Sequence, residues 1–109
     1  MYLKENQERA GVLDIGSNSI RLVIFRGNGV APLLEFNEKA LCGLGNEIQK
    51  TGKLSKIGRA SAIENIARFA KIIEKMNLRQ LHVIATSAVR EAADGRQFVA
   101  ELEKLFNFS

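Results

Sequence analysis

The chain has 109 residues, of which 46% are hydrophobic and 26% charged, so its composition is globular and it has room for one domain or part of a larger one. Sixteen Lys and Arg against twelve Asp and Glu give a net charge of +4, which favours a polyanionic partner. The single cysteine excludes an intrachain disulfide, and no apolar run approaches the roughly 18 residues of a membrane helix. We therefore expect a cytoplasmic protein without a membrane partner.

The polar segment 1–10 is a predicted lead-in before two strands, at 11–15 and 20–25. The strands are separated by a tight polar loop, Ser17-Asn18-Ser19. Backbone N–H groups, hydroxyls and an amide in such a loop can surround an anion such as phosphate. The same residue types are common in ordinary hairpin turns, so the loop alone leaves both interpretations open. Both faces of the second strand are largely apolar, which predicts a sheet covered on two sides.

A hairpin turn is predicted at Gly27-Asn28-Gly29, because Asn and Gly both tolerate positive φ. It leads to a third strand at 30–39. Pro32 cannot donate a hydrogen bond to a central ladder, so this strand is expected at an edge of the sheet. The segment 40–53 contains several glycines without a clear period and is predicted to be a loop.

The longest predicted element is a helix that Ser55 caps, that extends to about Met76 and that stops at Asn77. Its residues at helical spacing predict a buried stripe: Ile63, Ile66, Ala67, Phe69, Ala70, Ile73 and Met76. A short apolar strand follows at 81–85.

The last predicted helix begins with a capping pattern, Asp-x-x-Gln, from Asp94 to Gln97. Its predicted buried face consists of Phe98, Leu102, Leu105 and Phe106. The order β-β-β-α-β-α indicates an α/β fold with a mixed sheet, in which strand 81–85 runs parallel to a neighbour. Because the pattern stops just after a helix, we expect the fold to be incomplete at the C-terminus.

A second polar motif leaves the end of strand 81–85, with Thr86 and Ser87 followed by Arg90. In open α/β sheets, ligands bind outside the carboxyl ends of the strands. If this strand lies parallel beside strand 11–15, both polar loops open on one edge, and Arg90 can reach an anion held by the first loop. A guanidinium binds phosphate in a bidentate way and stays charged. Taken alone, Arg90 is more typical of a solvated helix residue, and Thr86 and Ser87 of a helix cap. The presence of both polar loops reverses this preference.

Together, the motifs DIGSNSIRL and ATSAVREA resemble the exopolyphosphatase/guanosine pentaphosphate phosphatase family of the actin, sugar-kinase and Hsp70 superfamily. The resemblance extends from Gly11 to about Phe106 and includes Gly43-Leu44-Gly45. It implies that residues 11–109 are the N-terminal portion of the first, ribonuclease-H-like domain of a two-domain phosphatase. Such enzymes remove terminal phosphate from polyphosphate, or the 5′-γ-phosphate from guanosine pentaphosphate, with Mg²⁺ or another divalent cation.

The resemblance also implies roles for individual residues. Phosphate contacts are implied for Ser17, Asn18, Ser19, Thr86, Ser87, Arg90 and Arg21. For Arg21, pairing with a carboxylate is the alternative. Asp14 matches an acid that helps to hold metal and water. The family's catalytic glutamate lies in a segment following the last helix here, so no catalytic residue is assigned, and Glu91 and Glu101 do not match it.

The complete protein is therefore expected to be a phosphoanhydride hydrolase and a homodimer, whereas these 109 residues alone are expected to be inactive. The alternative is a phosphate- or nucleotide-binding or regulatory fragment without turnover. Nucleic-acid binding is disfavoured, because few aromatic residues are available as stacking platforms. His82 is interpreted as structural, and Cys42 as a buried or incidental thiol.

Overall fold

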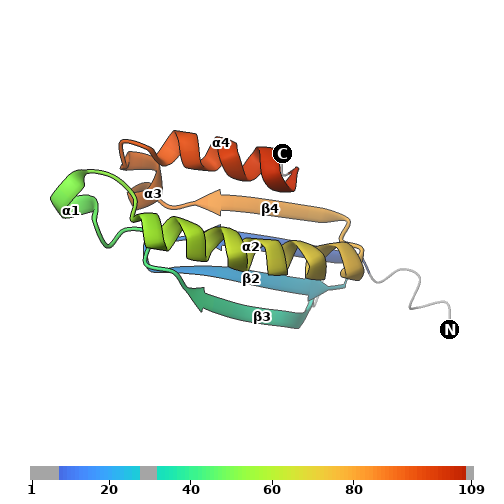
Figure 1. The fold of residues 1–109 in the computed structure, drawn as a ribbon. Coiled ribbons are helices and arrows are strands. Elements are labelled where there is room, and N and C mark those ends of the chain that lie inside the picture. Colours follow the sequence, from blue (N-terminus) through green and yellow to red (C-terminus); the bar gives the residue numbers. More distant parts are fainter. Residues whose placement is uncertain (1–7, 28–31, 108–109) are drawn as a thin grey trace, which may run out of the picture.

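The computed structural model describes residues 8–27 and 32–107. Four strands and four helices follow one another along the chain: β1 (Arg9–Ile15), β2 (Ser19–Arg26), β3 (Leu33–Leu41), α1 (Ile48–Thr51), α2 (Lys56–Met76), β4 (Gln80–Ala85), α3 (Ser87–Glu91) and α4 (Gly95–Phe106). The predicted order is confirmed (Figure 1). Two short helices were not expected, namely α1 inside the predicted loop 40–53 and α3 directly after β4.

The strands form a mixed sheet in the order β3-β2-β1-β4. β1 and β2 are antiparallel, as are β2 and β3, whereas β1 and β4 are parallel. In the parallel pair Ile15 lies opposite Ala85, so both strands end at the same edge of the sheet. β3 is an edge strand, as predicted, and it begins just after Pro32. The predicted turn at 27–29 and the start of the predicted strand 30–39 fall mostly outside the described residues.

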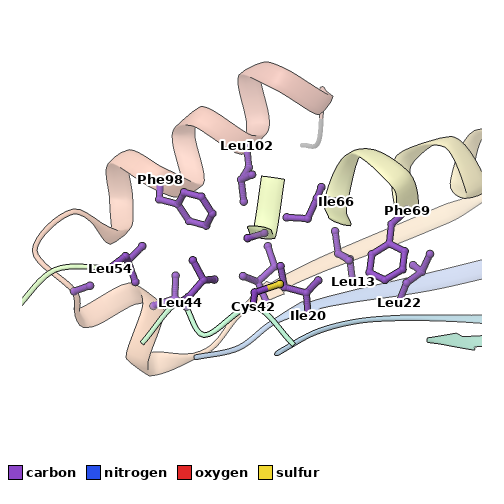
Figure 2. Close-up of a cluster of buried hydrophobic side chains, with 14 of the residues drawn as sticks. Leu13, Ile20, Leu22, Cys42, Leu44, Leu54, Ile66, Phe69, Phe98 and Leu102 are labelled. Atoms are coloured by element: carbon purple, nitrogen blue, oxygen red, sulfur yellow. The ribbon is translucent and has the colours of Figure 1, made fainter. Parts of the chain in front are cut away.

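The hydrophobic core lies between one face of the sheet and the helices. The sheet contributes Leu13, Ile15, Ile20, Leu22 and Ile24, all of them buried. Figure 2 shows Ile66 of α2 and Phe98 and Leu102 of α4 facing the same cluster. Since one cluster contains side chains from both helices, α2 and α4 cover the same face (Figure 1).

The opposite face of the sheet is open in the described part of the chain, so the prediction of a sheet covered on two sides is wrong for these residues. Phe25 of β2 is 37% exposed, and Leu34 of β3 and Ile84 of β4 are 56% and 51% exposed. The apolar outer face of β2 is therefore real, but neither α2 nor α4 packs on it.

Local signals set both ends of α2. The Ser55 hydroxyl accepts a hydrogen bond of 3.0 Å from the Gly58 N–H, and Asn77 ends the helix in the left-handed conformation with φ 57°. The predicted stripe is rotated by about one position, since the buried residues are Gly58, Ala62, Ile66 and Phe69. Ile63, Ile73 and Met76 are partly buried and pack against the core. Ala67 and Ala70 are also partly buried.

The start of α4 differs from its prediction. Asp94 is the residue before the helix, but its carboxylate makes no capping hydrogen bond. Oδ1 instead accepts a hydrogen bond of 2.9 Å from the Leu54 N–H, and Oδ2 accepts one of 3.2 Å from Arg59. Leu105 is 55% exposed, so its predicted place on the buried face is also wrong. Phe98 and Leu102, one turn apart, provide the buried contacts.

Within residues 8–27 and 32–107, none of the helices is both long and apolar enough to span a membrane.

Candidate functional site

The loop Ser17–Ser19 between β1 and β2 is hydrogen-bonded to the segment Cys42–Gly45, which follows β3. The Gly45 N–H donates to the Ser17 carbonyl at 2.8 Å. The Cys42 and Gly43 N–H groups both donate to the Asn18 carbonyl, at 2.9 and 3.0 Å. Every carbonyl of the loop is thereby engaged, since the Ser19 carbonyl accepts from the Gly16 N–H at 2.9 Å.

The N–H groups of the same loop are in a different situation. Among the described residues, the Ser17 and Asn18 N–H groups have no hydrogen-bond acceptor. The side chains of Ser17, Asn18 and Ser19 likewise make no hydrogen bond within the described ranges, and Asn18 is exposed. Such a loop keeps donors available for a ligand while its acceptors are satisfied by the protein, which suits an anion.

The second motif lies beside this loop. The Thr86 N–H donates a hydrogen bond of 3.0 Å to the Ile15 carbonyl, directly before Gly16. Ser87 begins α3, and the Arg90 N–H donates to the Thr86 carbonyl at 3.1 Å. The two polar motifs, Ser17–Ser19 and Thr86–Arg90, thus meet at the carboxyl ends of the parallel strands β1 and β4.

Arg90 is exposed and lines an open cavity of about 450 Å³ between β4 and α4. The other lining residues are Ala85, Gly95, Arg96, Val99, Ala100 and Glu103. Within the described residues, the Arg90 side chain makes no hydrogen bond and no ion pair. The positive charge of Arg90 is therefore available to a ligand at this edge of the sheet. No hydrogen bond or ion pair to a described residue fixes the position of its guanidinium.

Asp14 and Arg21 lie directly opposite each other in the antiparallel register of β1 and β2, on the open face of the sheet. The Arg21 guanidinium donates a hydrogen bond of 2.6 Å to the side-chain amide oxygen of Asn37 on β3. The expected alternative partner of Arg21 was a carboxylate, and the structure provides an amide instead. Asp14 is exposed and makes no ion pair with a described residue.

The described residues contain no group of three or more His, Cys, Asp or Glu that could hold a metal ion by itself. The Asp14 carboxylate is a hard oxygen donor three residues before Ser17, where the polar loop begins. Mg²⁺ is commonly bound by one or two carboxylates together with substrate phosphates and water, so a single carboxylate beside an anion loop fits this ion. His82 is exposed on the open face of the sheet, so burial gives no support to the structural role expected for it. Cys42 is buried.

The sequence did not reveal that the segment Cys42–Gly45 holds the loop. Its contacts are made by backbone N–H groups, which almost every residue type can provide, so the sequence does not reveal them. The available signal was the spacing of Gly43 and Gly45 immediately after a strand, which indicates close approach of two backbones.

Comparisons with known proteins agree with this geometry. The sequence profile of the Ppx/GppA phosphatase family matches residues 23–109. The chain is 34% identical over 99 residues to exopolyphosphatase 1 of Mycobacterium tuberculosis, a match that covers 88% of this chain and 28% of that protein. Its counterpart in Mycobacterium leprae is 32% identical, with 88% of this chain and 29% of that protein covered.

Solved structures give the same picture for the fold. A Ppx/GppA family member of Aquifex aeolicus superposes with a TM-score of 0.89 at 22% identity, over 94% of this chain and 33% of that one. An exopolyphosphatase of Cytophaga hutchinsonii gives 0.86 at 27% identity, over 94% of this chain and 33% of that one. The chain thus spans about a third of the length of these relatives.

Proposed function

Because the chain belongs to the Ppx/GppA phosphatase family, we propose that it forms the phosphate-binding side of the active site of an exopolyphosphatase. The complete enzyme would hydrolyse the terminal phosphoanhydride of inorganic polyphosphate with the help of a divalent cation. The observation that supports this most directly is the Ser17–Ser19 loop, whose carbonyls are bound by the protein while the Ser17 and Asn18 N–H groups have no acceptor among the described residues. The names of the curated relatives favour polyphosphate over guanosine pentaphosphate as the substrate.

The proposed chemistry requires mainly positioning and the neutralisation of negative charge. The loop N–H groups and the hydroxyls of Ser17, Ser19 and Thr86 would bind oxygens of the terminal phosphate. Arg90, which is exposed and free of a carboxylate partner in the described part, would bind the next phosphates of the chain. Arg21 is held by Asn37 on the sheet face, so its proposed contribution is long-range charge rather than a direct contact.

Asp14 would provide the oxygen ligand for Mg²⁺ or a related cation, which neutralises phosphate charge when bound. The remaining ligands would be substrate oxygens and water. We assign no described residue to orient or deprotonate the attacking water, and Glu91 and Glu101 are both exposed on helices. We place this role in the part of the enzyme that the relatives possess beyond the matched third.

A second candidate function is phosphate binding without turnover. It is favoured by the same assignment, since the described residues supply anion donors and one carboxylate for metal but no water-activating group. In that case the protein would bind polyphosphate and release no phosphate.

The test is an assay of the full-length protein with long-chain polyphosphate, with guanosine pentaphosphate, and with Mg²⁺ or EDTA. We expect Mg²⁺-dependent release of phosphate from polyphosphate, and a strong loss of this activity in the double variant Ser17→Ala/Ser19→Ala. Binding of polyphosphate without release would select the second candidate. Release from guanosine pentaphosphate alone would reassign the substrate, and neither binding nor release would contradict both candidates.

A further inference from the structure

The segment Cys42–Gly45 determines which way the peptide groups of the polar loop face. The Ser17 carbonyl points at the Gly45 N–H, and the Asn18 carbonyl points at the N–H groups of Cys42 and Gly43. No peptide bond in the described residues is cis, so each N–H points in the opposite direction from the preceding carbonyl, within the same peptide plane. The N–H groups of Asn18 and Ser19 therefore both point away from Cys42–Gly45.

The segment is itself held in place by the start of α2. The Leu44 carbonyl accepts a hydrogen bond of 3.0 Å from the Ser55 N–H, and the Leu44 side chain is fully buried. Gly58 lies so close beneath the segment that a Cβ there would be 2.8 Å from the Gly43 carbonyl oxygen and 2.9 Å from Leu44 Cα. The start of α2 thus packs against the segment Cys42–Gly45, and this segment in turn is hydrogen-bonded to the loop.

Within the segment Cys42–Gly45, Gly45 is the residue that lies against Ser17 of the loop. A Cβ on Gly45 would lie 2.8 Å from Ser17 Cβ, closer than real Cβ atoms approach, and 3.3 Å from Ser17 Oγ, a tight contact. The backbone of Gly45 is not among those with positive φ, so an alanine would be tolerated by the local conformation. Glycine is required there only for space.

We propose that Gly45 is a positioning residue for the anion site, because its missing side chain allows the hydrogen bond to the Ser17 carbonyl that directs the Asn18 N–H group toward a tetrahedral anion. The proposal deepens the proposed function, on which it rests only for the identity of that anion as the terminal phosphate of polyphosphate. Gly45 itself touches no substrate. Its effect passes through the orientation of the Ser17–Asn18 peptide group.

The experiment uses the full-length protein, ¹⁵N-labelled at Asn and Ser, titrated with inorganic phosphate. We expect phosphate to shift the Asn18 amide signal. In Gly45→Ala, we expect phosphate to bind at least about tenfold more weakly, the size of one lost charge-assisted hydrogen bond. In the hydrolysis assay, the same variant should raise the KM for polyphosphate more than it lowers kcat.

Two further variants separate positioning from general damage. Gly11→Ala is a control for a new methyl group elsewhere on β1, because a Cβ there would be 2.7 Å from Leu78 Cδ1, at the opposite end of β1. It should leave phosphate binding unchanged within about twofold. Ser17→Gly removes the atoms that the new methyl would strike, so Gly45→Ala added to Ser17→Gly should cost less than about twofold in phosphate affinity.

Equal phosphate affinity of Gly45→Ala and wild type would overturn the proposal, as would equal weakening by Gly11→Ala. If Gly45→Ala does not fold, the Ser17→Gly background decides, and a loss of more than about fivefold on adding Gly45→Ala there would overturn it. These outcomes are independent of the proposed function. A wild-type protein that shows the Asn18 amide shift without hydrolysis contradicts the enzyme but not the positioning role.

Discussion

The Thr86 N–H donates a hydrogen bond of 3.0 Å to the Ile15 carbonyl and so joins two polar motifs that are far apart in the sequence. Ile15 is the last residue of β1, and Thr86 follows the last residue of β4, its parallel neighbour. The bond extends the parallel ladder by one residue, directly before the polar loop begins. This backbone hydrogen bond thereby places the Thr86 side chain next to the start of the Ser17–Ser19 loop.

This arrangement predicts that the Thr86 hydroxyl serves binding and not folding. In Thr86→Val the N–H bond to Ile15 and the side-chain shape are kept, and only the hydroxyl is lost. We expect an unchanged melting temperature and a KM for polyphosphate raised about tenfold or more, the value of a hydrogen bond to a charged group. Thr86→Ser, measured in parallel, should retain the wild-type KM. A Thr86→Val enzyme with normal KM would remove Thr86 from the proposed site.

The charge of Arg90 is predicted to contribute to substrate binding. Arg90→Ala should raise the KM for polyphosphate by about tenfold or more, since a charged contact to phosphate is lost, with little effect on stability because the side chain is exposed. Arg96→Ala is the matched control, because Arg96 is exposed on α4 and lines the same cavity. Equal losses in both variants would mean that the general charge of this cavity, and not Arg90, attracts the substrate.

Asp14 is predicted to act through the metal. Asp14→Asn should raise the Mg²⁺ concentration needed for half-maximal activity and lower kcat, because an amide is a much weaker ligand for a hard cation. The free energy of unfolding should change by less than about 0.5 kcal/mol, since the side chain is exposed and without an ion pair in the described part. His82→Gln, another exposed position on the same face, serves as the control. Unchanged Mg²⁺ dependence in Asp14→Asn would contradict the metal role.

Much of the fold was predictable because its signals are local. Ser55 and Asn77 mark the two ends of α2 through their own backbone and side-chain chemistry, and the apolar runs mark the strands. The capping pattern from Asp94 to Gln97 led to a wrong prediction of a helix cap, because the partners of the Asp94 carboxylate are distant in the sequence. The donors that occupy the Asp94 carboxylate, Leu54 and Arg59, are 40 and 35 residues away, and no local pattern announces them.

The candidate site was predictable to the same degree. The meeting of the Ser17–Ser19 loop and Thr86 follows from the parallel pairing of two strands, which the strand–helix–strand order indicates. The support by Cys42–Gly45 was not predictable, because it consists of backbone hydrogen bonds between separate segments. The position of the Arg90 side chain relative to the loop could not be predicted from the sequence either, because it depends on the orientation of the short helix α3.

Asp94 is predicted to make stability depend on pH in the acid range. Burial raises the pKa of Asp94, but hydrogen bonds from the Leu54 N–H and from its own N–H, together with Arg59, outweigh burial and hold the pKa below the ordinary 3.8. A carboxyl group whose pKa is lower in the folded state stabilises the fold while it is ionised. This stabilisation is fully present above 3.8 and is lost as the pH falls through the lower, folded-state pKa.

Removing the carboxylate should therefore lower stability at neutral pH and flatten its dependence on acid. In Asp94→Ala we expect a free energy of unfolding lower by about 1.5–3 kcal/mol at pH 7, because the Leu54 N–H and Arg59 both lose their acceptor. The difference from wild type should shrink as the pH is lowered below 3.8, as denaturant unfolding of the full-length protein would show. Glu91→Ala, an exposed acid nearby in the chain, should show neither effect. A pH-independent difference between Asp94→Ala and wild type would mean that the side chain contributes by packing and not by its charge.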